Sequence, residues 1–289
     1  MNSETLRIFL TVASELSVTH AATRLGRAPS NVTTRIQQLE TDIGTQLFIR
    51  TGKRMSLSSA GEHFVDYARR LLALEEEARN VVTGGRDGGV LRIGSMESTA
   101  ASRLPTLLAR YHTLHPSTLL DLSTGPSRPL LERVRNGQLD CAFVALPTSI
   151  NQDDLLPELG LKWTSVWNEE LCILLPVSES ATSRFGDIKI RSLAAFPQGC
   201  TYRSIAEELL GIAGSTEWKV QEMPSYHVMI ACTAAGASAT LVPRSVLELT
   251  SIPEGLKTLP AGHADTLLVW REGYNTPAFT HFLAQISED

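Results

Sequence analysis

Residues 28–40, APSNVTTRIQQLE, combine a thin apolar stripe with many hydrogen-bonding side chains. Val32, Ile36 and Leu39 are spaced by four and then three, so they share one helical face. The other faces carry Ser30, Asn31, Thr33, Thr34, Arg35 and Gln38. Asparagine can pair with adenine, arginine with guanine or phosphate, and threonine methyls with thymine, so this set suits base recognition in a major groove. A solvated polar helix face is the alternative interpretation.

Basic residues flank this predicted helix. Arg27 precedes it, and LFIRTGKRMSLS (47–58) follows with Arg50, Lys53 and Arg54. That segment predicts a two-stranded hairpin with Thr51-Gly52-Lys53 at its tip. Residues 1–70 hold nine Lys/Arg against six Asp/Glu, whereas the whole chain has a net charge of −5. A locally basic head on an acidic body indicates a small module that binds a polyanion, with these cations on phosphates or in the minor groove.

A second group of polar residues gathers where buried strands are predicted to end. Its members are Glu97, Ser98 and Thr99, then Gly125, Pro126 and Ser127, and later in the chain Tyr202, Arg203, Ser204, Tyr226 and His227. Hydroxyls and free amides at helix starts bind carboxylates, and Arg203 would add charge for an acid. Glu97 and the two tyrosines would instead hold an amine. Each serine or threonine could also simply cap a helix.

Catalytic and metal-binding patterns are weaker. GASAT (236–240) fails GxSxG at its last position and precedes a predicted strand, and Ser225 with His227 is only a local pair. His112 and His115 are three apart on a predicted helix without a third ligand, and the four cysteines are dispersed. We therefore expect no enzyme, no metal and no cofactor. A hydrolytic or solute-binding α/β protein with an accessory DNA-binding head is the alternative.

The sequence shows no recognisable targeting signal. No run of about 18 apolar residues suggests a membrane span, and MNSETLRIFL lacks the features of a secretory signal. We expect a cytoplasmic protein with no membrane partner.

Residues 1–58 must position the polar helix. Ser17 is a plausible N-cap for a helix over 18–25, and Gly26 suits its left-handed end. A third helix is predicted from Pro29 to Thr41, before Gly44. A small residue at Ala22, a glycine turn at Gly26 and a buried apolar residue at Val32 are typical of a helix-turn-helix motif. The basic hairpin that follows makes the predicted domain a winged helix-turn-helix.

Residues 59–86 are predicted to form a long linker helix and a hinge. Ser59-Ala60-Gly61-Glu62 resembles a capping box with Ser59 as N-cap, and GGRDGG (84–89) ends the helix. Apolar residues then recur at spacings of four and three, at Ala60, Phe64, Tyr67, Leu71, Leu74, Ala78 and Val81. This heptad pattern favours a dimerisation helix, although docking on its own domain would produce the same stripe.

Residues 87–289 predict a two-lobed α/β domain. Strands at 90–96, 119–125 and 140–146 alternate with helices, which indicates a parallel sheet with ligands at the strands' carboxyl ends. A second unit begins at EELCILLPV (169–177) and includes a Ser204-Ile205-Ala206-Glu207 capping box, a helix over 226–235 and the strand ATLVP (239–243). DTLLVWR (265–271) and a helix near 277–286 return to the first unit. We expect lobe I at about 87–165 and 266–289, lobe II at about 166–265, and a cleft between them.

Longer stretches of the chain resemble LysR-type transcriptional regulators. The head does so in AATRLG, SNVTTRIQQLE, IGTQLFIR and LSSAGE, and the remainder in LRIG, LPTLLARYHTLHPSTLLDLSTG, LLERVRNGQLDCAFV, LCILLP, AAGASATLVPRSVLE and LVWR. The resemblance implies a winged helix-turn-helix head that binds a double-stranded DNA operator. It also implies an effector domain like periplasmic binding proteins with a small-molecule effector, assembly from homodimer to homotetramer, and RNA polymerase as a further partner.

A subgroup of that family is closer still. APSNVTTRIQQLE, GSMESTAA, STGPS, TYRS and MPSYHVMIAC are similar to a subgroup that includes an enterobacterial regulator responding to putrescine. This resemblance implies an effector from nitrogen or amine metabolism, and together with the residues above we expect an amine, an amino acid or a carboxylate. The chain departs from the family at Ala28, where glutamine is usual, and at Thr34, where arginine or lysine is frequent. One common DNA contact would then be lost, and Arg35 would either compensate for it or read another base.

Overall fold

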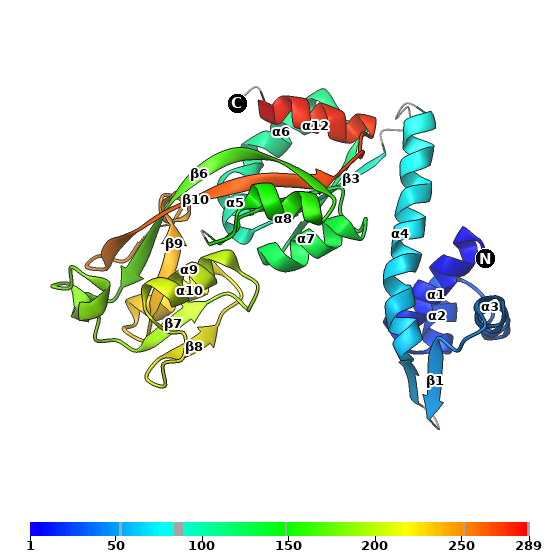
Figure 1. Cartoon of the computed structure of the whole chain (residues 1–289), viewed down its shortest axis with the longest axis horizontal. Helices are drawn as coiled ribbons and strands as arrows, with labels where there is room; N and C mark the ends of the chain where they lie inside the picture. Colours follow the sequence, from blue (N-terminus) through cyan, green and yellow to red (C-terminus); the bar gives the residue numbers. More distant parts are fainter. Residues whose placement is uncertain (52–53, 84–88, 148, 251, 288–289) are drawn as a thin grey trace. The chain divides into compact units, whose positions relative to one another are not determined.

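The computed structural model describes residues 1–51, 54–83, 89–147, 149–250 and 252–287, with the side chain of Arg50 not among them (Figure 1). The predicted hairpin tip at Gly52 and Lys53 and most of the GGRDGG hinge lie outside the described residues. The chain divides near residue 84 into two compact units, which we describe separately.

The first unit begins with three short helices, α1 (Ser3–Glu15), α2 (Val18–Leu25) and α3 (Pro29–Ile43). The Ser17 side chain accepts a hydrogen bond from the backbone N–H of His20, and Gly26 ends α2 at φ 63°, as predicted. Gly44 ends α3 in the same left-handed region at φ 79°. Val32, Ile36 and Leu39 are fully or almost fully buried in the core that these helices share with Phe9.

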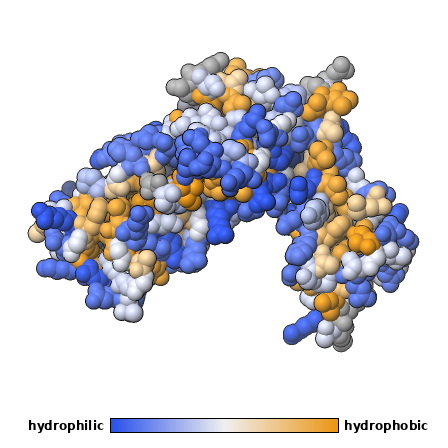
Figure 2. All heavy atoms as spheres, in the orientation of Figure 1, coloured by the Kyte–Doolittle hydropathy of each residue, from blue (hydrophilic) through white to orange (hydrophobic). Residues whose placement is uncertain are grey.

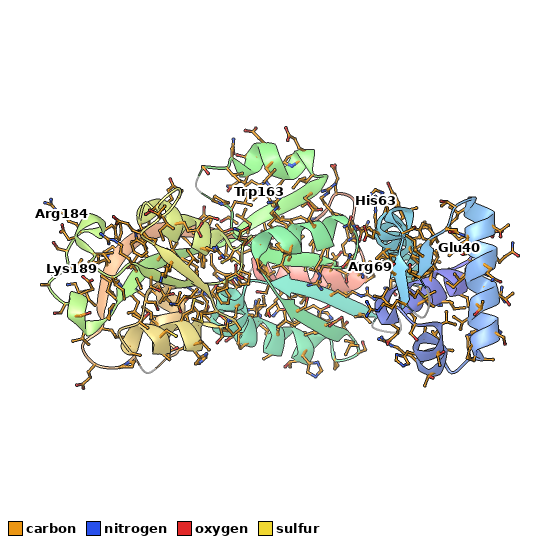
Figure 3. All side chains as sticks on the ribbon, turned by 90° about the horizontal axis from the view of Figure 1, so that it is seen from below. Glu40, His63, Arg69, Trp163, Arg184 and Lys189 are labelled. Atoms are coloured by element: carbon orange, nitrogen blue, oxygen red, sulfur yellow. The ribbon has the colours of Figure 1, made fainter. Side chains whose placement is uncertain are left out.

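A two-stranded hairpin follows, with β1 (Phe48–Thr51) antiparallel to β2 (Arg54–Leu57). One carboxylate oxygen of Glu40 (Figure 3) accepts hydrogen bonds from the backbone N–H groups of Leu47 at 2.8 Å and Phe48 at 3.1 Å. The last turns of α3 therefore hold the base of the hairpin, so the helix and the wing keep a defined relationship.

The N-cap of the long helix α4 (Ser59–Val82) lies one residue earlier in the chain than predicted. Its N-cap is Ser58, whose Oγ accepts from the Gly61 backbone N–H at 3.0 Å and donates to the carbonyl of Gln46. Ser59 is the first helical residue, so its assignment as N-cap was wrong. Gly61 packs so closely on the Leu47 carbonyl that a Cβ there would overlap it, which explains why the helix begins in this register.

The second unit is built on one eight-stranded sheet with the order β4-β3-β5-β10-β6-β9-β7-β8. The bounds are β3 (Val90–Ser95), β4 (Leu119–Thr124), β5 (Cys141–Val144), β6 (Leu161–Leu175), β7 (Ser192–Ala195), β8 (Lys219–Glu222), β9 (Ala239–Pro243) and β10 (Lys257–Arg271). We call the end with β3, β4 and β5 lobe I and the end with β7, β8 and β9 lobe II. In lobe I, β3 is parallel to β4 and β5, as the alternating pattern predicted. In lobe II, β7 is parallel to β8 and β9, whereas the two strands predicted there, within β6 and β9, are antiparallel to each other.

Helices cover both lobes (Figure 1). They are α5 (Glu97–Ser102), α6 (Leu104–Leu114), α7 (Ser127–Arg135), α8 (Gln152–Glu158) and α12 (Pro277–Ser287) on lobe I, and α9 (Thr201–Leu209), α10 (Tyr226–Ala234) and α11 (Arg244–Leu247) with the 3-10 turns Val177–Glu179 and Phe185–Asp187 towards lobe II. Among the described residues, no helix is both long and apolar enough to cross a membrane.

Two long antiparallel strands, β6 and β10, run through both lobes (Figure 1). Only their second parts were predicted, from 169 and from 265, because their first parts have polar, half-exposed residues that do not read as buried strands. The short strands β7 and β8 were missed altogether. The return of the chain to the first unit was predicted correctly. The paired strands β6 and β10 together form the connection between lobe I and lobe II.

The capping box predicted at Ser204 was also wrong. Helix α9 begins at Thr201 with Cys200 as N-cap, so Ser204 lies within the helix and its Oγ donates to the Cys200 carbonyl. Glu207 pairs with Arg203 instead of reaching back to an N-cap. Ser204 and Glu207 are one turn apart within the helix, and the same S-x-x-E spacing is typical of a capping box, so the sequence alone does not distinguish the two.

Candidate functional site

Helix α3 divides cleanly into a buried and an exposed face. Val32, Ile36 and Leu39 are at most 2% exposed. The predicted DNA-facing residues lie on the other side: Thr33 is half-buried, and Ser30, Asn31, Thr34, Arg35 and Gln38 are exposed. Because the apolar stripe alone docks the helix, its polar face is available to another molecule.

The polar side chains on α3 differ in how freely they can be used. The hydroxyls of Thr33 and Thr34 each donate to the backbone carbonyl four residues earlier, at 3.0 Å. Gln38 Nε2 donates to Asp42 Oδ1 at 2.8 Å. Arg35 makes no ion pair with any residue that the structure describes, so its guanidinium is free to meet a base or a phosphate.

The neighbouring cations also differ. Arg27 is held by Glu4 at 2.5 Å between its Nη2 and the carboxylate. Arg54 at the start of β2 is exposed. Lys53 and the Arg50 side chain, the other two predicted wing contacts, lie outside what the structure describes.

The predicted dimerisation stripe on α4 is largely exposed. Tyr67 and Leu74 are each 60% exposed, Leu71 is 41% and Val81 is 45%, and Ala78 is exposed as well. Figure 2 shows apolar atoms along the length of this helix. Phe64 is different: its ring packs on Phe9 of α1 with centroids 5.0 Å apart, in the core of the first unit.

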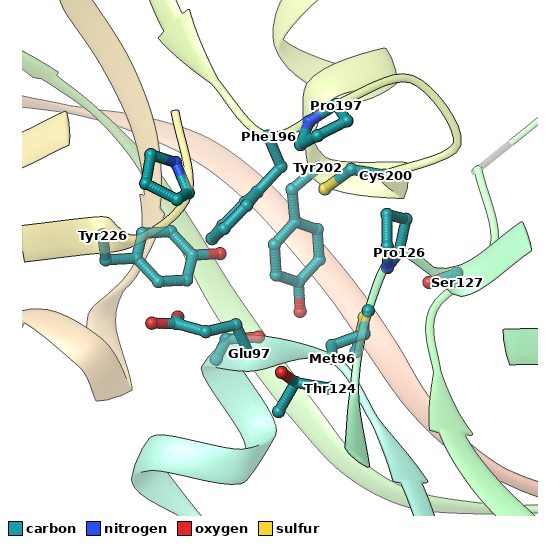
Figure 4. Close-up of a pocket in the computed structure, with 13 residues that line it drawn as sticks. Met96, Glu97, Thr124, Pro126, Ser127, Phe196, Pro197, Cys200, Tyr202 and Tyr226 are labelled. Atoms are coloured by element: carbon teal, nitrogen blue, oxygen red, sulfur yellow. The ribbon is translucent and has the colours of Figure 1, made fainter. Parts of the chain in front are cut away.

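A cavity of about 230 Å³ lies between the lobes of the second unit, at the ends of β3, β4 and β7 (Figure 4). Lobe I contributes the segment after β3 and the segment between β4 and α7. Lobe II contributes the loop between β7 and α9 and the start of α10. The lining residues are Met96, Glu97, Ser98, Thr124, Gly125, Pro126, Ser127, Phe196, Pro197, Cys200, Tyr202, Pro224 and Tyr226.

Glu97 is the centre of the cavity's electrostatics. Burial raises the pKa of its carboxyl, while the nearby His227 and the backbone N–H of Tyr226 lower that pKa in part. Burial likewise raises the pKa values of Tyr202 and Tyr226 above the ordinary tyrosine value, so both rings carry neutral hydroxyls. The cavity lining contains no Lys, Arg or His, and Glu97 is the only acidic residue among the lining residues.

Buried polar groups of three residues meet in this cavity. Glu97 Oε2 has no hydrogen-bond partner among the described residues, and the hydroxyls of Ser98 and Tyr202 lie within reach of each other. Figure 4 shows the side chains of Glu97, Tyr202 and Tyr226 directed into the same space. Unpaired buried polar groups are costly, so the Glu97 oxygen marks a place where a polar ligand would be stabilised.

The structure brings together most of the predicted effector-binding residues. Seven line the cavity: Glu97, Ser98, Gly125, Pro126, Ser127, Tyr202 and Tyr226. Thr99 is buried in α5 away from it, and His227 is exposed on α10, acting on Glu97 only through its charge. Ser204 lies at another hollow.

Arg203 does not enter the cavity either. Its guanidinium is held by Glu207 at 2.7 Å and by Glu222 at 2.8 Å, and it also donates to the backbone carbonyl of Phe196. The charge of Arg203, which we expected to bind an acidic effector, is therefore compensated by two glutamates outside the cavity lining.

Sequence reasoning missed six lining residues, Met96, Thr124, Phe196, Pro197, Cys200 and Pro224. Met96, Thr124 and Pro224 are immediate neighbours of predicted residues or of a predicted helix start. Phe196 and Pro197 follow β7, and only recognition of that short strand would have indicated them. Phe196 packs edge-on against Tyr226 with centroids 4.9 Å apart, which gives the cavity an aromatic wall.

The described residues offer no group of three or more His, Cys, Asp or Glu that could hold a metal ion. The chemistry that the cavity supports is hydrogen bonding and charge pairing with a small organic ligand.

Comparison with known proteins covers both units. Residues 3–62 match the family model for bacterial regulatory helix-turn-helix proteins of the lysR family, and residues 84–289 match the LysR substrate binding domain. The HTH-type transcriptional regulator GltR of Bacillus subtilis is 37% identical over 248 residues, which are 86% of this chain and 81% of that protein. YofA of the same organism is 31% identical over 294 residues, covering 100% and 99%.

Solved structures show the same fold. CbnR in complex with its target DNA superposes with a TM-score of 0.69 at 22% identity, over 100% of this chain and 99% of that one. A full-length OxyR variant from Pseudomonas aeruginosa gives 0.68 at 19% identity, over 99% and 94%. With a helix-turn-helix head, a two-lobed domain and family matches over both, the chain belongs to the LysR family of DNA-binding transcriptional regulators.

Proposed function

We propose that this regulator reads its operator with the exposed face of α3 and changes its operator binding when a small amine occupies the cavity between the lobes. The observation that carries the proposal is the cavity itself, whose lining has one carboxylate, no cationic side chain and a buried oxygen of Glu97 without a hydrogen-bond partner among the described residues. A ligand with hydrogen-bond donors and a positive charge complements all of these features.

Operator recognition is assigned to the residues predicted from the sequence. Base edges would be contacted by Ser30, Asn31, Thr33, Thr34 and Arg35. Gln38 would join them when its hydrogen bond to Asp42 is broken. Arg27, Arg50, Lys53 and Arg54 would contact phosphates or the minor groove. The exposed face of α3 and the absence of an ion pair for Arg35 among the described residues support this division.

Dimerisation is assigned to α4. A contiguous row of exposed large apolar side chains is unfavourable in water and marks an interface. Tyr67, Leu71, Leu74 and Val81 form that row, and the small, exposed Ala78 continues it. Phe64 supports the same helix from inside its own unit. A homodimer would pair two heads on the operator, and dimers would combine into a homotetramer, with RNA polymerase as a further contact.

The proposed boundaries follow from these roles. Residues 1–58 would form the operator-binding domain, 59–86 the dimerisation helix and hinge, and 87–289 the effector domain, with the lobe limits given above. The protein would act in the cytoplasm, where the operator is, and would bind its effector without turning it over.

An ammonium group would lie against Glu97, with the faces or hydroxyls of Tyr202 and Tyr226 around it. This choice agrees with the resemblance to the putrescine-responsive subgroup. It also explains how Arg203 can be occupied elsewhere, since an amine needs no cation. A carboxylate effector is disfavoured, because Glu97 would repel it.

The link between the two sites would be a shift between lobe arrangements. A ligand that contacts both lobes stabilises the arrangement in which both contacts are made. The effector domains of an oligomer would then pack differently, the spacing of the paired heads would change, and the bend of the operator would follow.

The proposal is tested by selecting DNA from a random library with the full-length protein and titrating the selected operator with and without butane-1,4-diamine. Enrichment of a defined sequence, and an operator affinity that shifts with the diamine, are expected. Failure to enrich any sequence would contradict the DNA assignment. A thermal-shift screen of amines, amino acids and carboxylates that stabilises the protein only with carboxylates would contradict the effector class.

A further inference from the structure

A second, larger cavity of about 440 Å³ lies on the other side of the contact between the lobes. It shares only Ser127 with the cavity described above. Its walls come from α7, from residues 145–147 and 150, from α8 and its end, and from the start of α9, and the lining includes Arg128, Leu131, Leu146, Ile150, Leu155 and Leu159.

The two cavities are separated by a tight hydrogen-bonded contact. The Thr201 hydroxyl of lobe II donates to the Ala145 carbonyl of lobe I at 2.6 Å, and the Arg128 backbone N–H donates to the Gly199 carbonyl at 3.2 Å. Gly199 has φ 92°, and a Cβ there would lie 3.2 Å from the Pro129 ring. The backbones meet too closely here for a ligand to span both cavities through the contact.

The walls of this second cavity are mainly apolar. Leu131 is 6% exposed, whereas Leu146, Leu155 and Leu159 are half-buried and Ile150 is 38% exposed. Isoleucine and leucine side chains that remain partly open to a hollow gain free energy when an apolar ligand removes them from water. The ligand body that fits is therefore a short alkyl chain or a ring.

Two charged residues line this cavity, Arg128 and Glu132. Glu132 is paired with Arg135 on the same helix at 3.0 Å. Arg128 is exposed and has no ion pair in the part of the chain that the structure describes. The uncompensated charge at this cavity is thus positive, opposite to that of Glu97 in the first.

We infer that the second cavity is a separate ligand site for a small apolar carboxylate, with its hydrocarbon part against the leucines and Ile150 and its carboxylate on Arg128. Bidentate pairing with a guanidinium suits a carboxylate in particular. The site does not depend on the proposed amine effector, since the two cavities differ in lining and in charge.

Both cavities have walls from both lobes and adjoin the same contact. A ligand in either one therefore acts on the same equilibrium between lobe arrangements, and the two sites must be coupled reciprocally if that equilibrium shifts. The protein would in this way sense a carboxylate together with an amine.

Titration calorimetry of the full-length protein with hexanoate tests the inference. The wild-type protein is expected to bind one hexanoate per chain. Arg128→Gln should weaken that binding about tenfold, as loss of one charge-assisted pair predicts. Ile150→Trp, at an exposed position that tolerates a larger side chain, should fill the cavity and abolish binding.

Arg184→Gln is the matched control, because Arg184 is an exposed arginine at the end of lobe II distant from this cavity (Figure 3). It should leave the hexanoate affinity unchanged. The inference is overturned if hexanoate does not bind, or if the two arginine variants bind it equally. It is also overturned if Glu97→Gln tightens hexanoate binding, which would place the carboxylate in the first cavity. Absence of hexanoate binding, or equal binding by the two arginine variants, leaves operator and diamine binding untouched, so failure of this inference is separable from failure of the proposed function.

Discussion

Thr201 and Ala145 join the two lobes of the effector domain directly: the threonine hydroxyl at the start of α9 donates a 2.6 Å hydrogen bond to the alanine carbonyl after β5. Both residues are buried, at 4% and 0% exposure. The Ala145 backbone N–H in turn donates to Ser127 Oγ at 3.2 Å. One residue of lobe I thus connects the start of α7 with the start of α9, between the two cavities.

Replacing Thr201 should loosen this connection. Thr201→Val keeps the shape but leaves the buried Ala145 carbonyl without its donor, which costs about 1–3 kcal/mol. Urea unfolding should show a lower free energy of unfolding for the effector domain. Thr113→Val removes a comparable hydroxyl bond on an exposed helix and should change stability by less than about 0.5 kcal/mol. Equal effects of the two variants would exclude a special role for Thr201.

Arg35→Ala should weaken operator binding by about 1–3 kcal/mol, because one base or phosphate contact is lost. A gel-shift titration measures the change, and sedimentation should show that the oligomeric state is retained. Arg184→Ala removes the same charge from lobe II and serves as control. An unchanged operator affinity for Arg35→Ala would refute its assignment.

Leu74→Glu should weaken dimerisation without unfolding the chain, since Leu74 is 60% exposed and a charge within an apolar interface is unfavourable. Sedimentation equilibrium should show dissociation at protein concentrations where the wild type stays associated. His63→Glu introduces the same charge at an exposed polar position of α4 and should leave association intact. If both variants dissociate equally, the stripe is not the interface.

Glu97→Gln should reduce diamine affinity about tenfold or more, because a charged hydrogen bond becomes neutral. The wild type should also lose diamine affinity as the pH falls through the pKa of Glu97. Burial raises that pKa above its usual value of 4.5, so the loss begins at a higher pH than for an exposed glutamate. Calorimetry across this range should show the pH dependence in the wild type and not in Glu97→Gln.

His115 should make the effector domain sensitive to acid. Its ring stacks on His281 with centroids 4.3 Å apart, and burial together with the His281 charge lowers its pKa below 6.5. The folded state therefore takes up this proton less readily than the unfolded state, and stability falls as the pH drops below 6.5. His115→Gln should flatten the dependence of Tm on pH in that range, and an unchanged slope would contradict the account.

Local signals in the sequence predicted the head well. Ser17, Gly26 and the spacing of Val32, Ile36 and Leu39 act within one or two helical turns, so they could be recognised without knowledge of the fold. Ser58 was harder, because its role as N-cap depends on a hydrogen bond to Gln46 across the hairpin. Tertiary contact, not spacing, decides between Ser58 and Ser59.

The effector site shows the same distinction. Glu97 and Tyr226 follow from helix starts after predicted strands or turns, and both line the cavity. Arg203 has the right position in the chain but points to Glu207 and Glu222, which are partners that sequence alone does not assign. Phe196 depends on the short strand β7, whose four residues are too few to produce a clear pattern.

Protection of the selected operator from nuclease cleavage, compared with and without butane-1,4-diamine, tests the central claim most directly. The account predicts that the diamine changes the extent of the footprint or the pattern of enhanced cleavage that marks a bend, and that Glu97→Gln removes this response while still binding the operator. Identical footprints and affinities in the presence and absence of the diamine would contradict it.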